Sequence, residues 1–331
     1  MLPTILSIIA RFAVPRPIHR AALLPVLAAF WDPIPPRFQS GNAQATAAGH
    51  PTPPASYIIR RHDRPDSLYL ALGRKYSTLA HLYLPVPTGA ADGEGTVIAP
   101  SWVLTAAHVA TEVKPGHRIT AGGEAYTVDS IVLHPDWSDG PHDIALLRLT
   151  QPVRGVRPAQ LYRESAELDQ PIVVVGYGDM GTGLSGPTGN DGQVRGATNR
   201  VDEATDFWLK FLFDAPDSKR ATPLEGISGP GDSGGPAFLD GIECEILVGV
   251  GSGQSTRATG GNPGRYGVTE YYTRVSRYVA WIESITGPLS HAEWPSASDT
   301  DRVVMDTGEC GTTTWHRPQV SWSGPDGVES L

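Results

Sequence analysis

The stretch Gly229-Pro230-Gly231-Asp232-Ser233-Gly234-Gly235-Pro236 contains four glycines and two prolines in eight residues. Glycine admits positive φ angles, and proline fixes φ and lacks an N–H donor, so this composition predicts a tightly turned loop. A serine at the centre of such a loop is held outside any strand ladder, beside backbone N–H groups that are free to face a ligand. Acyl transfer needs that combination of hydroxyl and donors. Because serine alone is a weak nucleophile, the hypothesis requires a histidine base and a buried carboxylate elsewhere.

Two upstream segments supply these partners. Residues 102–108, Trp102-Val103-Leu104-Thr105-Ala106-Ala107-His108, form an apolar run that ends in small residues and an imidazole. Residues 143–149, Asp143-Ile144-Ala145-Leu146-Leu147-Arg148-Leu149, place a carboxylate at the head of an apolar run, where burial is expected. The order His, Asp, Ser in these three contexts resembles the chymotrypsin/trypsin-like serine protease family. The resemblance covers residues 58–286.

The resemblance implies a role for each of these residues. Ser233 would attack the scissile carbonyl, His108 would accept and return its proton, and Asp143 would orient the imidazole. The backbone N–H groups of Gly231 and Ser233 would form the oxyanion hole. Taken singly, each residue also has a structural interpretation: the serine loop as a turn, the histidine as a core or surface residue, the aspartate as a cap. Their joint occurrence in the family's order favours the catalytic interpretation.

The resemblance also implies a mode of activation. Asp232 matches the carboxylate that, in the family, pairs with the α-amino group released by cleavage of a zymogen. Ile58 is the candidate for that new terminus. However, Arg60-Arg61 follow where the family has small residues, and cleavage after Tyr57 would need an unusual activator. Activation at Ile58 is therefore a hypothesis, and it fails if a mature active form keeps the residues before it.

Substrate specificity depends on four further positions that the resemblance assigns to the primary pocket. Ile227 stands where a trypsin-like enzyme would carry an aspartate at the pocket floor, which disfavours recognition of basic side chains. Ser252 and Gly253 would line the pocket wall, with Ser252 hydrogen-bonded to the substrate backbone. Glu270 is either a solvated residue on a strand edge or, if it points inward, a second route to basic specificity. We expect cleavage after apolar residues.

Composition excludes several other classes of function. The net charge is −9, and no basic run suggests a surface for nucleic acid or for an anionic membrane. His117, His134 and His142 are expected to be surface residues without metal-ligand spacing, so the sequence predicts neither a metal nor a cofactor.

The chain has only two cysteines, Cys244 and Cys310. Animal members of the family usually carry several disulfides, including one around the histidine loop and one near the serine. Those positions are not cysteine in this chain, which is a feature of bacterial-type members. A Cys244–Cys310 bridge is one alternative in an oxidising compartment, but two isolated thiols are the preferred expectation.

The two ends of the chain differ from its middle. Residues 1–45 combine basic residues, a short apolar run and Ala43-Gln44-Ala45, which predicts a signal peptide; a disordered tail is the alternative. Residues 46–57 would be a linker or pro-segment, and residues 287–331 a polar tail of unknown role. The mature protein is thus expected to be secreted or periplasmic, without a membrane span.

Between these ends the sequence alternates short apolar runs with turn residues, which predicts an all-β fold. The resemblance implies two six-stranded antiparallel β-barrels, divided near residues 151–170, with a C-terminal helix at Ser276–Ile285. Residues 178–196 are expected to be a long loop. The predicted strands are Leu68–Leu72, Ala80–Leu84, Thr96–Ile98, Trp102–Thr105, Arg118–Ala121, Ala125–Leu133, Ile144–Leu149, Ile172–Gly176, Phe207–Phe213, Pro236–Leu239, Glu245–Val250 and Tyr271–Val275.

These observations predict a monomeric serine endopeptidase that cleaves protein or peptide substrates through an acyl-enzyme. Two alternatives remain open. A catalytically idle homologue would use the same scaffold to bind a protein, since fold does not guarantee activity. An acyl hydrolase would use the same catalytic residues on esters.

Overall fold

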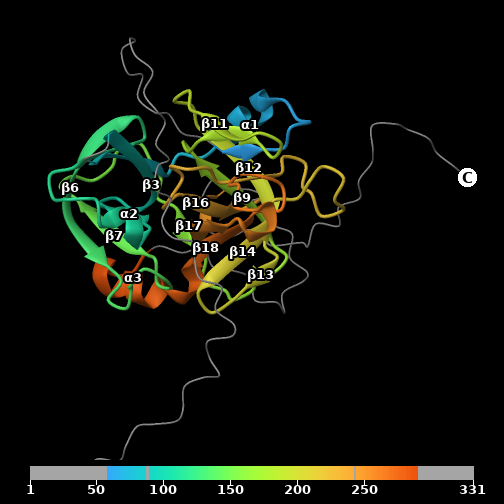
Figure 1. Cartoon of the computed structure of the whole chain (residues 1–331). Coiled ribbons are helices and arrows are strands. Elements are labelled where there is room, and N and C mark those ends of the chain that lie inside the picture. Colours follow the sequence, from blue (N-terminus) through green and yellow to red (C-terminus); the bar gives the residue numbers. More distant parts are fainter. Residues whose placement is uncertain (1–57, 87–88, 242–243, 290–331) are drawn as a thin grey trace, which may run out of the picture. The chain divides into compact units, whose positions relative to one another are not determined.

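A computed structural model describes residues 58–86, 89–241 and 244–289. Six strands of the first half close into a barrel in the order β2-β3-β4-β7-β6-β5, seen at the left of Figure 1. Alternation decides which side chains face its interior: in β5 every second residue is buried, as expected for a strand with one face to solvent. The barrel strands are β2 (Leu79–Val86), β3 (Gly89–Ala99), β4 (Trp102–Thr105), β5 (Arg118–Ala121), β6 (Glu124–Leu133) and β7 (Ala145–Leu149).

The second half is a curled antiparallel sheet in the order β12-β9-β16-β17-β18-β14-β13, with β8 paired beside β17. Its hydrogen bonds do not close into a ring among the described residues, so this half is an open, curled counterpart of the first barrel. The all-β prediction is confirmed. The strands are β8 (Gln160–Leu161), β9 (Pro171–Gly176), β12 (Arg195–Arg200), β13 (Glu203–Ala204), β14 (Trp208–Leu212), β16 (Pro236–Leu239), β17 (Ile246–Ser255) and β18 (Thr269–Arg274).

A smaller sheet, β11-β10-β1-β15, covers one end of the second half. The prediction that residues 178–196 form a loop is wrong, because β10 (Met180–Thr182), β11 (Gly186–Gly189) and the start of β12 lie there. No apolar alternation marks them: β10 is ordered by parallel pairing with β1 (Ile59–Arg60), far away in the sequence. The remaining strand of this sheet is β15 (Gly226–Ile227).

One predicted strand, Leu68–Leu72, is instead part of helix α1 (Asp66–Gly73). Tyr69 and Gly73, one helical turn apart, are the buried residues of α1, whereas Leu68 is exposed. Asp66 forms an ion pair of 2.6 Å with Arg195 of β12, which fixes the helix against the sheet. A second short helix, α2 (Ala107–Ala110), was also not predicted.

The chain ends its described part in α3 (Val279–Thr286), which confirms the predicted C-terminal helix. Two 3₁₀ turns, η1 (Arg257–Thr259) and η2 (Val275–Arg277), flank β18. In Figure 1 α3 lies beneath the first barrel, beside α2 and β7. Accordingly, Val279 and Ile282 belong to the same apolar cluster as the barrel interior.

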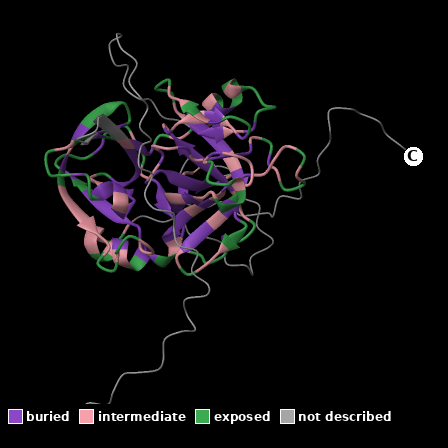
Figure 2. Cartoon of the chain, in the orientation of Figure 1, coloured by how far each residue is buried: buried purple, intermediate pink, exposed green. Residues whose placement is uncertain are grey.

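Burial follows the two halves, as Figure 2 shows by colour. One apolar cluster fills the first barrel and continues under α3, and a second fills the curled sheet around Ile59, Phe211 and Tyr272. Cys244 is disulfide-bonded, so the expectation of isolated thiols is wrong for this residue. Cys310, residues 1–57 and the polar tail from residue 290 onward lie outside the described residues. No helix within the described ranges is long and apolar enough to span a membrane.

Candidate active site

Strand pairing brings His108 and Asp143 together. β4 and β7 are antiparallel neighbours, with Thr105 opposite Ala145, so the chain leaving β4 lies beside the chain entering β7. His108 follows on α2, and Asp143 lies two residues before the first residue of β7. The Nδ1 atom of His108 lies 2.7 Å from Asp143 Oδ2, and the backbone N–H of His108 donates to Oδ1 at 2.9 Å.

Asp143 is held from both halves of the molecule. From the second half, the Ser252 hydroxyl donates to Asp143 Oδ2 at 2.6 Å, and the Thr273 hydroxyl donates to the Asp143 backbone carbonyl at 2.8 Å. Burial opposes ionisation of Asp143, but the charge of His108 and the donors of His108 and Ser252 outweigh it and lower the pKa of this carboxyl. An ionised Asp143 accepts from Nδ1–H, which leaves Nε2 of His108 as the basic nitrogen.

A β-bulge directs Ser252 to this contact. The register between β17 and β18 shifts between Gly251 and Gly253, which leaves Ser252 as the extra residue. Gly253 resumes the pairing, opposite Tyr271. The Ser252 hydroxyl therefore donates to Asp143, and the assignment of Ser252 and Gly253 to the wall of the primary pocket stays a prediction.

Hydrogen bonds connect the loop that carries Ser233 to Glu94 of β3 and, through Glu94, to Thr105 at the end of β4. The backbone N–H of Glu94 donates to the Ser233 carbonyl at 2.8 Å, and the Thr105 hydroxyl donates to the Glu94 carbonyl at 2.5 Å. Gly234 has a φ of 83°, and a β-carbon there would collide with Glu94 O and Thr105 Oγ1. Glycine at this position therefore lets Ser233 lie close to the strand that leads to His108.

Two N–H groups of this loop lack acceptors. The amides of Asp232, Gly234 and Gly235 donate to backbone carbonyls. Within the described part of the chain, no acceptor is found for the amides of Gly231 and Ser233. These are the two donors that the sequence predicts for an oxyanion hole, and the positive φ of Gly231, 99°, turns its peptide as only glycine does readily.

The carboxyl of Asp232 is buried beside that of Glu94. Asp232 accepts from the amides of Gly178 and, at 2.7 Å, Gly229, while Glu94 accepts from the amide of Tyr177. Both carboxyls are fully buried. Burial raises the pKa of Asp232 to about 7, and burial together with the charge of Asp232 raises that of Glu94 well above its usual range. The pair therefore holds at least one proton at neutral pH.

Sequence reasoning did not find Glu94, which follows Gly93 in a strand without any catalytic motif. The only signal is a charged residue flanked by glycines inside a strand, Gly93-Glu94-Gly95. Ile58 is fully buried in the second apolar cluster, and its neighbour Ile59 pairs with Ile227 of β15. Cleavage before Ile58 stays a prediction.

The sequence and the fold are similar to those of known proteins. The sequence profile of the family "Trypsin" matches residues 89–282, more than half of the 331-residue chain. The chain belongs to the trypsin family. A trypsin from Squalus acanthias is 30% identical over 209 residues, covering 57% of this chain and 82% of that protein. Human chymotrypsin-like elastase family member 1 is 29% identical over 221 residues, covering 58% and 80% respectively.

These trypsin-family relatives are animal proteins, as is the Simulium vittatum trypsin, which is 31% identical over 53% of this chain and 75% of its own length. The bacterial affiliation inferred from the missing cysteines is therefore not supported. Among solved structures, neuropsin, a serine protease of mouse brain, has a TM-score of 0.50 at 22% identity, covering 69% of this chain and 98% of neuropsin. HL collagenase has a TM-score of 0.51 at 19% identity, with 70% and 98% covered. At these identities both structures show the trypsin fold alone.

Glu270 is one of the residues that the resemblance assigns to the primary pocket. One of its two expected positions, a solvated strand edge, is wrong. It is 1% exposed, and its Oε2 atom accepts from the Ser228 hydroxyl at 2.6 Å. Gln254, also buried, donates from Nε2 to the Ser228 carbonyl at 2.8 Å. Among the described residues, Oε1 of Glu270 and Oε1 of Gln254 are buried without a donor. Ile227, which precedes Ser228 in the sequence, is fully buried.

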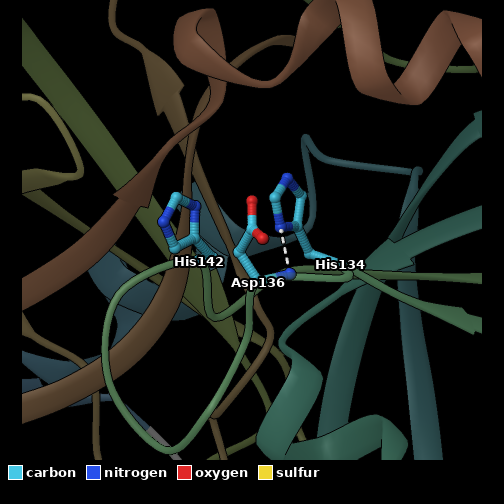
Figure 3. Close-up of side chains that lie close together, drawn as sticks. All are labelled: His134, Asp136 and His142. Atoms are coloured by element: carbon cyan, nitrogen blue, oxygen red, sulfur yellow. Dashed lines mark hydrogen bonds between the residues drawn. The ribbon is translucent and has the colours of Figure 1, made fainter. Parts of the chain in front are cut away.

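His134 and His142, which the sequence predicts to be surface residues without metal-ligand spacing, lie together in the structure. Both are partly buried, their rings stack with centroids 4.8 Å apart, and Asp136 lies with them (Figure 3). The spacing His134-Pro135-Asp136, with His142 six residues later, could have signalled this group from the sequence.

Proposed function

We propose that this trypsin-family chain is a serine endopeptidase in which Ser233, His108 and Asp143 act as a catalytic triad. The observation that carries the proposal is the pairing of the His108–Asp143 contact with a serine loop whose Gly231 and Ser233 amides have no acceptor among the described residues. His108 Nε2 takes the Ser233 proton as the hydroxyl attacks the scissile carbonyl. The two amides stabilise the oxyanion, and His108 then protonates the leaving amine.

The test is intact mass of the full chain with and without a fluorophosphonate probe, beside Ser233→Ala. A single adduct on the wild-type protein and none on the variant is the expected result, with peptide turnover in the variant lower by roughly 10⁶-fold. The same spectrum gives the mature amino terminus and so tests cleavage at Ile58. An unlabelled, folded form that begins at Ile58 would sink the enzyme proposal and favour an idle, protein-binding homologue. Faster turnover of esters than of matched amides, with no cleavage of proteins, would favour the esterase alternative.

The side chains at the primary pocket support a finer proposal on substrate class. Two buried acceptor atoms, on Glu270 and Gln254, find no donor among the described residues, which favours a substrate side chain that brings N–H donors and a positive charge. We therefore propose preferential cleavage after Arg or Lys, in place of the apolar preference expected from Ile227. Burial raises the pKa of Glu270 to about 8, although the Ser228 hydroxyl favours its ionised form.

This proposal has its own test, which is the ratio of kcat/KM for otherwise identical Arg and Leu peptides. Glu270→Gln should lower that ratio by about 30-fold, the fold-change of a lost buried charge pair. In the wild-type enzyme the ratio should rise as pH approaches 8, because Glu270 must be ionised to pair with Arg. A ratio that Glu270→Gln leaves unchanged contradicts basic specificity, without touching the triad proposal.

We further propose that the mature protein works as a secreted monomer. The disulfide bond at Cys244 supports an oxidising compartment, since such bonds are rare in the cytosol. Recovery of the protein from the medium with a new amino terminus near residue 46 would agree with the predicted signal peptide. Retention of Met1 in the secreted form would contradict that prediction.

A further inference from the structure

Three potential metal ligands gather where β6 ends and the chain turns toward β7. His134, Asp136 and His142 each offer one donor atom, and these atoms lie within 4.8 Å of one another. Figure 3 shows the Asp136 carboxylate between the two imidazole rings. Two imidazoles and a carboxylate are a ligand set that zinc takes in proteins, with water completing the tetrahedron.

The ring contacts leave one nitrogen of each histidine available. The amide of Asp136 donates to His134 Nδ1 at 3.3 Å, and the Tyr278 hydroxyl lies 3.2 Å from His142 Nδ1. For Nε2 of either ring no partner exists among the described residues. Contacts on the second nitrogen are what orient a metal-binding imidazole. Each ring thus keeps Nε2 as a potential metal donor.

The planes of the two rings are inclined by only 9°. A metal ion binds the neutral form of an imidazole. Burial, and next the charge of His142, lower the pKa of His134, whereas Asp136 opposes the shift. Tyr278 is the other titratable group that faces both rings, and burial raises its pKa to about 12, so it stays neutral.

We propose that His134, Asp136 and His142 bind one divalent transition-metal ion, with zinc the best fit, and that the bound ion inhibits the adjacent catalytic centre. Zinc–nitrogen bonds of about 2.0–2.1 Å place tetrahedral donors about 3.3 Å apart, so the three donors must close in by up to about 1.5 Å. His134 is fixed by its amide, which donates to the Ile144 carbonyl at 3.1 Å. Asp136 lies on an exposed loop and His142 ends that loop, so these two residues move toward His134.

His142 is joined directly to Asp143 of the proposed triad by one peptide bond, so a movement of His142 also moves the backbone of Asp143. His142 has a φ of 65°, and its carbonyl accepts from the Ile144 amide at 2.8 Å, so the backbone on both sides of Asp143 is constrained. Drawing the His142 ring toward zinc turns the peptide that carries Asp143. The 2.7 Å contact between Asp143 and His108 then lengthens, and the imidazole loses its productive orientation. Inhibition rests on the proposed protease function, whereas metal binding does not.

Metal binding is tested first, in the full-length Ser233→Ala chain, by calorimetric titration with zinc chloride alone. We expect one zinc per chain, with affinity at least about tenfold weaker in Asp136→Asn and lost in His134→Gln. Asp136 is exposed, so its variant tests the site without disturbing the core. His117→Gln is the matched control, since His117 belongs to no such group in the described ranges. No binding, or binding that both cluster variants retain, overturns the proposed site.

Inhibition is then measured on the active chain as kcat/KM against zinc concentration. We expect activity to fall as zinc is added, to return with EDTA, and to need at least about tenfold more zinc in Asp136→Asn than in wild-type or His117→Gln protein. Binding without loss of activity overturns the coupling and leaves the site. Inhibition that His134→Gln and Asp136→Asn both retain places the inhibitory zinc elsewhere, with His108 the obvious ligand, and overturns the proposal. An inactive wild-type chain that still binds zinc would count against the protease function alone.

Discussion

Asp143 and Asp232 are both buried aspartates of the catalytic region, yet their carboxyl pKa values shift in opposite directions. Asp143 faces an imidazole and the Ser252 hydroxyl, which favour its ionised form. For Asp232, burial outweighs its two amide donors and the hydrogen bond to the Glu94 carboxyl, all of which favour the ionised form. Burial alone therefore does not decide charge in this protein; the partner does. Asp143 is thus held as an anion beside His108, whereas Asp232 shares a proton with Glu94.

The two carboxyls should affect stability at opposite ends of the pH range. The pKa of Asp143 is lowered on folding, so its stabilising contribution is present above its ordinary value of about 4 and lost as pH falls. The pKa of Asp232 is raised to about 7, so the folded state holds the extra proton, and the associated stability is lost as pH rises through 7. Stability should therefore be greatest in mildly acidic solution.

The largest effect is expected from Asp143→Asn. Three donors converge on the two Asp143 oxygens: the His108 amide, His108 Nδ1–H and the Ser252 hydroxyl. An amide side chain supplies only one oxygen, so its NH₂ group must face one of these donors, and the imidazole adopts the wrong tautomer. We expect kcat to fall by roughly 10⁴-fold with KM little changed, measured on one peptide amide substrate. A loss below tenfold would show that His108 does not depend on this carboxylate.

A smaller effect is expected from Ser252→Ala, which removes one donor to Asp143 and leaves the others. A hydrogen bond to a charged group contributes about 1.5–3 kcal/mol, so kcat/KM should fall by at least about tenfold. The acid limb of the pH–rate profile should move to higher pH, because the Asp143 anion is less stabilised. Ser284→Ala, on the exposed side of α3, is the matched control. An unchanged acid limb would mean that Ser252 acts only through packing.

The smallest effect on activity near pH 6 is expected from Glu94→Gln, because the proton shared with Asp232 already neutralises one carboxyl there. The difference in stability between the wild-type protein and Glu94→Gln should appear as pH rises. Unfolding of Ser233→Ala protein, which cannot digest itself, should give a Tm that falls from pH 6 to pH 9, and Glu94→Gln should flatten that decline. Glu112→Gln, at an exposed position, should leave it unchanged. A wild-type Tm that stays constant over this range would contradict a proton-sharing pair.

Much of the candidate site could be predicted from sequence because its chemistry is written in short local patterns. The glycine-rich serine loop, the run that ends in His108 and the aspartate before β7 each combine a proposed catalytic side chain with the backbone that presents it. Secondary structure is harder to predict from sequence where a strand forms by pairing with a remote strand and has no apolar pattern of its own. For that reason the sequence does not predict β10 and β11. The short apolar run Leu68–Leu72 predicts a strand, whereas it forms part of helix α1.

The sequence by itself determined the all-β character, the order His108, Asp143, Ser233 and the glycines that turn the serine loop. Only the tertiary structure decided what surrounds these residues. Ser252 meets Asp143 from 109 residues away, and Ser228 meets Glu270 across 42. Glu94 and Asp232 come from different halves of the chain, and His134 stacks on His142 because their loop returns upon itself. A buried carboxyl carries no mark of its partner in the linear sequence, so its charge is fixed only when folding brings the partner to it.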